Sequence, residues 1–407
     1  MKSQNYVYDK HGNYKFLIED GVLLKTYLAS DYDRIREIEI PDSVTELSKT
    51  AFSNCSVYYV KRIFIPKTVL TVQNGAFHEF VGEFVVENGC MAIAYHDGIL
   101  YSGDRTRIIK ATGGLKEKNI AIPHGVTEIG AKAFYKTELR SVQLPTTLTY
   151  IGKEAFADNQ LTEISLPENL LKIDRAAFEL NHIKTVNIPP KLTTMNVGAF
   201  DYNDIVEFQV DNENKHFKVY DGVLFNSNLT KLIQCPQKKT GTFAIPNSTT
   251  QIVKTAFSCC ELDEVIIPAS IGKTLPCFFE FSRIKKVVIQ EGVECIEHSA
   301  FLNCTFLEEV VLPNTIKRIE SQAFNGCSRM KSFTIPDGTE YIGVWSITGV
   351  NIEEIYIPSS VNYIGVAAFP VRKSYHNKAV GLKCLRIHNN PYAVQYAKDH
   401  GYPFKEV

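Results

Sequence analysis

Cysteine and histidine are the residue types that could carry metal or nucleophilic chemistry in this chain of 407 residues, which contains ten of each. The histidines are scattered and form no HxxxH, HExxH or Cys/His cluster, and no two cysteines form a CxxC pair. Metal sites use such short spacings because several side chains must converge on one ion. We therefore predict no metal site and no cofactor.

Motifs for covalent catalysis and phosphate binding are equally weak. No serine lies in the G-x-S-x-G turn that exposes a nucleophile. Gly113-Gly114 and Gly272-Lys273-Thr274 resemble fragments of a phosphate loop, but the second would need glycine at position 267, which is Ile267. Asp97 and Asp221 each precede glycine, as is typical of a turn. We predict no catalytic residues and no enzyme activity.

An internal repeat accounts for most of the chain. Leu139-Arg-Ser-Val-Gln-Leu-Pro145 recurs 22 residues later as Leu161-Thr-Glu-Ile-Ser-Leu-Pro167 and again as Ile183-Lys-Thr-Val-Asn-Ile-Pro189. Each copy continues to an Ala-Phe pair and then to an asparagine. A fixed period in the twenties is typical of a solenoid, in which each coil packs only on its neighbours.

Twelve such units can be counted from the residue that ends each first strand. These anchors are Pro41, Pro66, Pro123, Pro145, Pro167, Pro189, Pro246, Pro268, Gln290, Pro313, Pro336 and Pro358. Two of the intervals between anchors, Pro66 to Pro123 and Pro189 to Pro246, are much longer than the others. Each contains an Asp-Gly pair between apolar runs, Asp97-Gly98 in the first and Asp221-Gly222 in the second. We predict inserted β-hairpins near residues 84–118 and 208–241.

The pattern inside a unit predicts how the coil folds. Val142 and Leu144 lie two residues apart and point inward, and Pro145 ends the strand because proline cannot donate to a ladder. Ala155-Phe156 then fills the interior. We expect an α/β-type repeat solenoid that is right-handed and mostly β. A parallel sheet lies on one side, and short helical or 3-10 turns form the outer layer.

Four cysteines share one position in the repeat, 14 residues after the anchor: Cys55, Cys260, Cys304 and Cys327. Other units place Asn159, Asn181 and Asn203 there. A small side chain that alternates between asparagine and cysteine indicates a position for packing and backbone bonding. We predict that these four cysteines are buried, reduced thiols.

The ends of the chain depart from the repeat. Residues 1–35 contain apolar runs around Asp20-Gly21 and are predicted to form an N-terminal cap. Residues 36–370 hold the repeats, and residues 371–407 a polar loop, a short helix near Pro391–Gly401 and a C-terminal cap. The units after Pro268 and Pro336 break the Ala-Phe rule, the second with Trp345-Ser346-Ile347, and we expect local distortion at both.

A candidate binding face follows from the outward positions of the later strands. Two residues before the anchors the chain has Ile266, Val288, Val311, Thr334 and Tyr356. Four residues before them it has Glu264, Lys286, Glu309, Ser332 and Glu354. An apolar stripe with a charged border is typical of a protein-binding surface. The alternative is that β-branched residues simply suit a strand.

Composition excludes two other classes. The net charge of −1 gives no basic surface for nucleic acid, and no apolar run approaches the roughly 20 residues that span a bilayer. The first residues, Met1-Lys-Ser-Gln-Asn-Tyr, lack the apolar core of a secretory signal. A cytoplasmic location therefore remains an alternative.

The repeat L-x-x-I-x-I-P-x-x-[LV]-x-x-I-G-x-x-A-F-x-x-[CN] resembles the bacterial BspA-like, or Treponema pallidum-type, leucine-rich repeat family over about residues 35–370. The resemblance implies a leucine-rich-repeat superhelix and a non-catalytic, monomeric protein-binding module at the bacterial surface or secreted. It also implies protein ligands such as host matrix proteins. Binding of carbohydrate or cell wall is the alternative.

Overall fold

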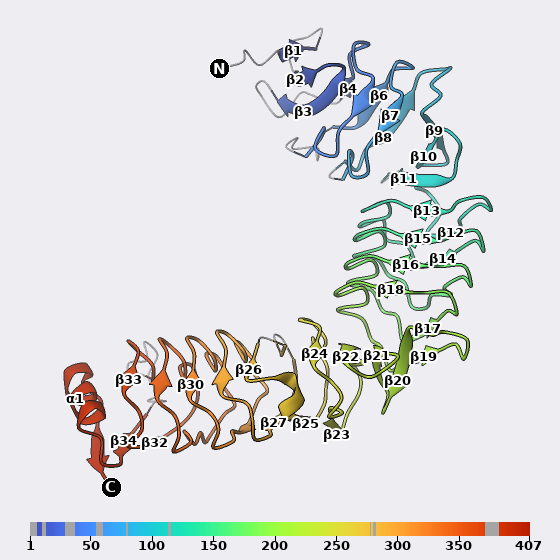
Figure 1. Cartoon of the computed structure of the whole chain (residues 1–407). Helices are drawn as coiled ribbons and strands as arrows, with labels where there is room; N and C mark the ends of the chain where they lie inside the picture. Colours follow the sequence, from blue (N-terminus) through green and yellow to red (C-terminus); the bar gives the residue numbers. More distant parts are fainter. Residues whose placement is uncertain are drawn as a thin grey trace. The chain divides into compact units, whose positions relative to one another are not determined.

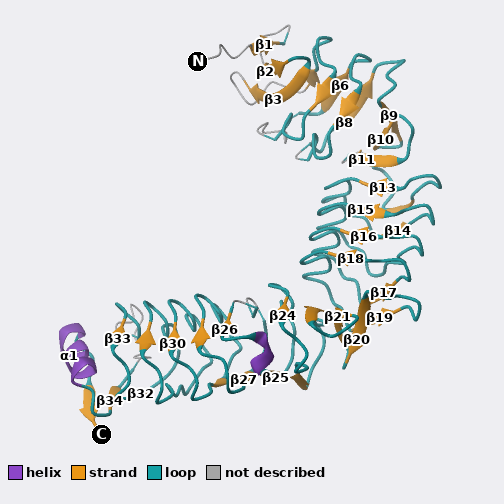
Figure 2. Ribbon diagram, viewed as in Figure 1, coloured by secondary structure: helices purple, strands orange, loops and turns teal. Residues whose placement is uncertain are grey.

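The computed structural model describes residues 6–9, 14–28, 37–53, 60–78, 80–112, 115–276, 278–279, 282–370 and 382–407. Cys55, Cys277, Gly113-Gly114 and the loop 371–378 lie outside the described residues. The chain divides into two compact units. Unit 1 is Met1–Asn203 with Val210–Lys215, and unit 2 is Asp204–Gln209 with His216–Val407. Both units are solenoids of stacked coils built of short strands and turns (Figures 1 and 2).

The first sheet of each unit is formed where the repeat reads Leu-x-x-Val-x-Leu-Pro. Its residues alternate between buried and outward positions, as in Thr185–Ile188, and neighbouring coils pair in parallel. The strands of unit 1 are β4 (Glu37–Glu39), β6 (Arg62–Ile65), β8 (Glu83–Val86), β12 (Asn119–Ala121), β14 (Ser141–Gln143) and β17 (Thr185–Ile188). Those of unit 2 are β23 (Thr242–Ala244), β25 (Glu264–Ile267), β27 (Lys286–Ile289), β29 (Glu309–Val311), β32 (Glu354–Ile357), β34 (Cys384–Ile387) and β35 (Phe404–Glu406). A further strand, β19, is Glu207–Val210.

Each coil also contributes to a second parallel sheet, which the repeat pattern did not predict. A two-residue strand forms around the buried aliphatic residue before the glycine, so that Tyr150 pairs with Lys172 and Ile151 with Ile173. In unit 1 these strands are β5 (Glu46–Leu47), β7 (Thr71–Val72), β13 (Glu128–Ile129), β15 (Tyr150–Ile151), β16 (Lys172–Ile173) and β18 (Thr194–Met195). In unit 2 they are β24 (Gln251–Ile252), β26 (Thr274–Leu275), β28 (Cys295–Ile296), β30 (Arg318–Ile319), β31 (Tyr341–Ile342) and β33 (Tyr363–Ile364).

Antiparallel hairpins lie where the sequence has its Asp-Gly pairs. Asp97 and Gly98 both have positive φ, 48° and 79°, and so do Asp221 and Gly222, 45° and 75°. Two successive positive φ values characterise the type I′ turn, whose twist matches the flanking strands. The strands are β1 (Tyr6–Tyr8), β2 (Tyr14–Glu19), β3 (Val22–Leu28), β9 (Ile93–His96), β10 (Ile99–Ser102), β11 (Arg107–Ala111), β20 (Phe217–Tyr220), β21 (Val223–Asn226) and β22 (Lys231–Gln234). In both inserts the last strand rejoins the second sheet, since β11 pairs in parallel with β13 and β22 with β24.

The core of each unit is a column of stacked phenylalanine rings. In unit 1 the ring centroids of Phe134, Phe156, Phe178 and Phe200 follow one another at 5.1, 5.2 and 5.0 Å with nearly parallel planes. The amide of Phe156 donates to the carbonyl of Ala177 at 2.7 Å, and this bond recurs along the outer layer. The column in unit 2 contains Phe257, Phe279, Phe301 and Phe324.

The two irregular coils behave differently from each other. After Pro268 the chain forms the 3-10 helix η2 (Ala269–Ile271), and Phe279 takes the stacked position. After Pro336 the outer-layer hydrogen bonds do not show the predicted distortion. Phe324 N–H donates to Ser346 O at 2.7 Å, and Ile347 N–H donates to Ala368 O at 2.9 Å. The reason is that buried Ser346 and Ile347 replace alanine and phenylalanine at these positions.

Helix is scarce in the described part of the chain, which contains η2 and α1 (Pro391–His400). The side chain of Asn390 caps α1 by accepting from Ala393 N–H at 2.9 Å, and Gly401 ends it with a φ of 70°. The buried Tyr396 hydroxyl donates to Gly365 O at 2.9 Å. The helix thereby packs against the last coils of unit 2.

Candidate functional site

The first sheet of unit 2 brings six of the predicted site residues together. β25, β27 and β29 pair in parallel so that Ile266, Val288 and Val311 lie side by side. Ile266 and Val288 are half-buried and Val311 is exposed. The same register aligns Glu264, Lys286 and Glu309 in the adjacent row.

The charged row beside the aliphatic side chains is internally neutralised. Lys286 Nζ lies 3.5 Å from a carboxylate oxygen of Glu264 and 3.4 Å from one of Glu309. The hydrogen bond and the charge of Glu309 raise the pKa of Lys286. One residue earlier, Lys285 pairs with Asp263 at 2.7 Å, which lowers the pKa of Asp263. The charged residues beside the aliphatic row therefore alternate in sign from strand to strand and form ion pairs with one another.

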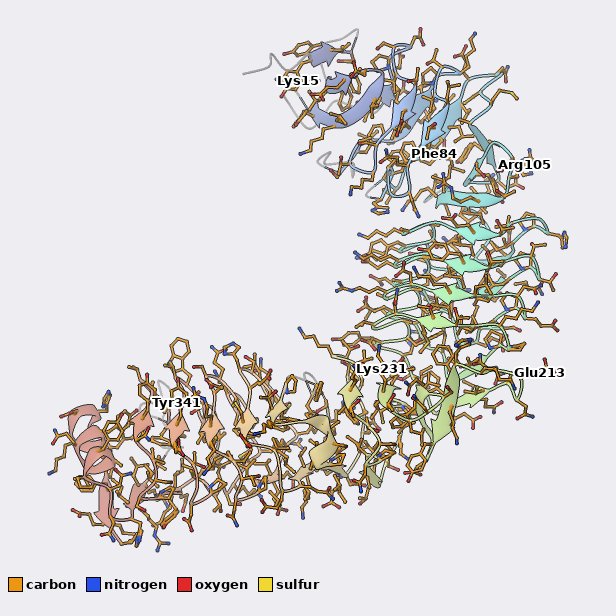
Figure 3. The ribbon with its side chains drawn as sticks, viewed as in Figure 1. Lys15, Phe84, Arg105, Glu213, Lys231 and Tyr341 are labelled. Atoms are coloured by element: carbon orange, nitrogen blue, oxygen red, sulfur yellow. The ribbon has the colours of Figure 1, made fainter. Side chains whose placement is uncertain are left out.

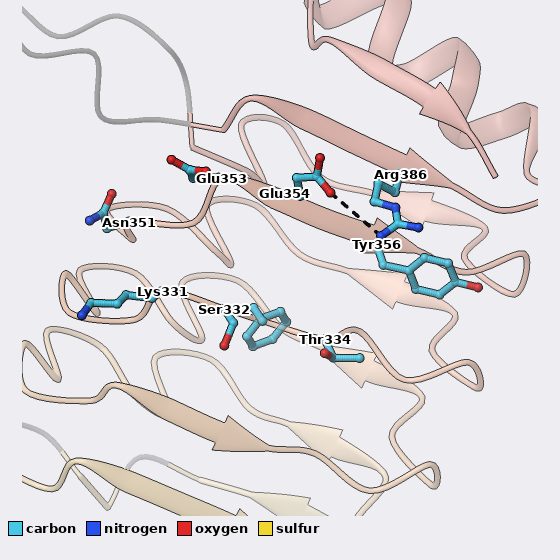
Figure 4. Close-up of a pocket in the computed structure, with 9 residues that line it drawn as sticks. Lys331, Ser332, Thr334, Asn351, Glu353, Glu354, Tyr356 and Arg386 are labelled. Atoms are coloured by element: carbon cyan, nitrogen blue, oxygen red, sulfur yellow. Dashed lines mark ion pairs between the residues drawn. The ribbon is translucent and has the colours of Figure 1, made fainter.

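The remaining predicted residues form a separate group further along unit 2. The ladder of β23, β25, β27 and β29 ends at β29, and the next coil contributes the single bridge between Thr334 and Tyr356. Here the surface has a hollow of about 570 Å³ (Figure 4). Its lining residues are Lys331, Ser332, Phe333, Thr334, Asn351, Glu353, Glu354, Tyr356 and Arg386.

The hollow is polar, and most of its charges are paired. Glu354 lies 3.3 Å from Lys405 Nζ and 3.9 Å from Arg386, the pair dashed in Figure 4. Glu353 pairs with Lys383 at 2.7 Å. The predicted residues therefore occupy one face of the first sheet in unit 2, but as an aliphatic ridge followed by a polar hollow.

A second surface was missed from sequence. Arg318, Tyr341 and Tyr363 are aligned by β30, β31 and β33, and Trp345, four residues after Tyr341, is an exposed residue of the same coil. The signal in the sequence was the pair Tyr341-Ile-Gly and Tyr363-Ile-Gly, 22 residues apart at the same repeat position. Figure 3 labels Tyr341 on unit 2.

The cysteines at the shared repeat position are buried wherever the structure describes them. Cys260, Cys304 and Cys327 are buried, and the described cysteines form no disulfide. No group of three His, Cys, Asp or Glu side chains within the described ranges could hold a metal ion. No helix in the same ranges has the length and apolar character needed to cross a bilayer.

Comparison with known proteins identifies the repeat. The model of the BspA type leucine-rich repeat region, with six copies, matches residues 24–93, 113–230, 235–316 and 295–390. The chain belongs to this family. The BspA-type repeat thus accounts for the solenoid, and no curated protein sequence matches the chain.

A solved structure of low sequence identity has the same fold. The pneumococcal vaccine antigen PcpA is 20% identical, with full coverage of both chains and a TM-score of 0.51. A leucine-rich repeat protein from Bacteroides ovatus is 21% identical, with 100% and 99% of the two chains covered and a TM-score of 0.44. A leucine-rich cell surface protein from Faecalibacterium prausnitzii is 18% identical, with 94% and 98% covered and a TM-score of 0.45.

Proposed function

We propose that this BspA-type protein is a non-catalytic, monomeric protein-binding module of the bacterial surface or secreted fraction. Its ligand would be a host surface or matrix protein. The observation that supports the proposal most directly is the in-register row of Ile266, Val288 and Val311 beside the Glu264–Lys286–Glu309 ion pairs. A solvent-facing aliphatic row with a polar border has the composition of a protein interface.

The neighbouring hollow extends the same face. Tyr356 is half-buried with its ring 6.4 Å from that of His388, and Thr334 is exposed. Together with Glu354 and Arg386, these groups would add hydrogen-bond donors and acceptors next to the aliphatic ridge. The ridge would contribute apolar burial and the hollow would contribute specificity.

The test is binding of the full chain to a panel of purified host matrix proteins by surface plasmon resonance. The double variant Val288→Asp/Val311→Asp should abolish binding because it buries two unpaired carboxylates in the interface. Since Val288 is half-buried, the single variant Val311→Asp is also measured, and unchanged thermal melting establishes that the fold is intact.

The matched control is Gln143→Asp/Asn187→Asp, which adds the same charge at the equivalent exposed strand positions of unit 1. It should bind like the wild type. Wild-type binding by the Val288/Val311 variant would place the site elsewhere, and failure of the whole panel would contradict the proposed class of partner.

A further inference from the structure

An exposed aromatic patch lies at the second-sheet strands β31 and β33 of unit 2, at the turns that follow them and at the first turn of α1. These elements are not the first-sheet strands that carry the candidate protein site. We define it as Tyr341, Trp345, Tyr363, Val366 and Tyr392. Trp345 is 49% exposed, Tyr363 42%, Tyr392 42% and Val366 64%, while Tyr341 is half-buried. Exposed large apolar groups gathered over two or three coils mark an interaction surface.

The tyrosines of the patch are held rigidly. The Tyr341 and Tyr363 rings stack with centroids 4.6 Å apart and planes 4° apart. The Arg318 guanidinium lies 4.0 Å from the Tyr341 centroid. Tyr392 is fixed because its hydroxyl accepts from Ile364 N–H at 2.9 Å. Such rings lose little conformational freedom when a ligand binds.

The backbone at Trp345 has the left-handed conformation that other coils also adopt at this turn. Its φ is 53°, in the left-handed region, which a bulky side chain rarely adopts. Other coils place Lys132, Glu154, Ala176, Gln322 or Ala367 at the same conformation. This conformation directs Trp345 N–H to Val366 O of the next coil at 3.4 Å, as Glu154 N–H donates to Arg175 O in unit 1. What distinguishes this coil is that the residue at the turn is an exposed aromatic one, and it is the single tryptophan of the chain.

The charges beside the patch are paired, which bears on the kind of ligand. Arg318 binds Glu320 at 2.8 Å, and Lys317 lies 3.9 Å from Glu340. The border therefore has hydrogen-bonding groups but no net charge. The four aromatic side chains offer on the order of 400 Å², whereas a stable protein interface takes about 800 Å² from each partner. Both features favour a neutral ligand smaller than a folded protein.

We propose that the aromatic patch binds a neutral oligosaccharide. The C–H face of one pyranose would pack on the open ring of Trp345, and the Tyr341–Tyr363 pair would form a ridge with two hydroxyls. The Arg318–Glu320 pair provides adjacent donors and acceptors for vicinal sugar hydroxyls. This site is independent of the proposed protein-binding face, so either can fail without the other.

The single tryptophan gives a direct readout. The full chain is titrated with cellohexaose, maltohexaose and chitohexaose while the intrinsic tryptophan emission is followed. Binding over Trp345 should shift the emission to shorter wavelength in a saturable way, because the indole loses water. Hexaproline and a heparin hexasaccharide are titrated in parallel as a peptide and a charged glycan.

The binding site is then assigned by comparing the affinities of variants, measured by calorimetry with the neutral sugar that shifts the tryptophan emission. Tyr341→Ser/Tyr363→Ser and Trp345→Asn should each weaken binding at least about tenfold, equivalent to about 1.4 kcal/mol. Asparagine is chosen because it tolerates the left-handed backbone. Two controls should bind like the wild type: Tyr150→Ser, at the equivalent position of unit 1, and Val288→Asp/Val311→Asp.

Several outcomes would overturn the proposal. They are the absence of any emission shift with the three sugars, a shift produced by hexaproline or heparin alone, or unchanged affinity in the patch variants. Loss of sugar binding in the Val288/Val311 variant with intact melting would also contradict it, because the two faces would then not be independent.

Discussion

Asparagine and cysteine fill the same repeat position with different numbers of hydrogen bonds. In unit 1 the Asn181 amide donates to the carbonyls of Phe156, Phe178 and Glu179, and its oxygen accepts from Leu161 N–H at 3.0 Å. In unit 2 the Cys304 thiol donates to Phe279 O at 3.1 Å. Both side chains pair a carbonyl of the preceding coil, which explains why the repeat accepts either.

We predict that Asn181→Ala lowers the free energy of unfolding by about 3 kcal/mol, because it leaves buried backbone groups unpaired. Cys304→Ala removes the weak thiol hydrogen bond to Phe279 O and should cost about 1 kcal/mol. Equilibrium urea denaturation measures both values. Equal losses in the two variants would contradict a role for the asparagine network.

The buried thiol of Cys327 predicts a pH dependence. Burial raises the pKa of Cys327 from 9.0 to about 12. The unfolded chain then releases this proton before the folded chain does. The contribution to stability is therefore fully present below pH 9.0 and is lost between pH 9.0 and about 12.

In that window the free energy of unfolding should fall by up to about 1.4 kcal/mol per pH unit for this thiol. The measurement is urea denaturation at a series of alkaline pH values for the wild type and Cys327→Ala. The alanine variant retains all other titrating groups, so the difference between the two slopes isolates the thiol. Parallel slopes would show that Cys327 is accessible in the folded chain.

The phenylalanine column is the element that joins successive coils through the interior. Phe178 is fully buried and stacks on Phe156 and Phe200 at 5.2 and 5.0 Å. Since a single coil has no core of its own, its stability comes from contacts with its neighbours. Removal of one ring therefore weakens two interfaces.

We predict that Phe178→Ala lowers the free energy of unfolding by about 3–5 kcal/mol, the range for loss of a buried aromatic ring. Leu171→Ala is the control, because Leu171 is an exposed aliphatic residue of the same coil and should change stability by less than about 0.5 kcal/mol. Urea denaturation compares the two. A near-neutral Phe178→Ala would mean that the ring stack contributes little.

At the scale of the whole molecule, the repeat separates the positions that stabilise the fold from those that we propose for binding. Inward positions of both units hold the same residue types, while outward positions differ from coil to coil. Unit 2 thus has an aliphatic ridge on its first sheet and an aromatic patch on its second. Substitutions on either surface should alter one binding activity and leave the solenoid folded.

The residues that face the core, and the fold that they stabilise, could be predicted from the sequence alone. The Phe156–Phe178 column repeats because each ring contacts its own counterpart one coil later. The Asp97-Gly98 and Asp221-Gly222 pairs mark hairpins because both residues of each pair take the positive φ of the turn. A periodic contact leaves a periodic pattern. Most of the fold, including the burial of Cys260, Cys304 and Cys327, could therefore be predicted.

The contacts among the outward-facing side chains were decided only by the tertiary structure. The position of Lys286 between two glutamates, the end of the ladder at β29 and the stacking of Tyr341 on Tyr363 depend on register between coils and on side-chain direction. The second sheet was also missed, because a two-residue strand is too short to show alternation. Outward residues meet no repeated packing requirement, so their neighbours are known only once the coils are stacked.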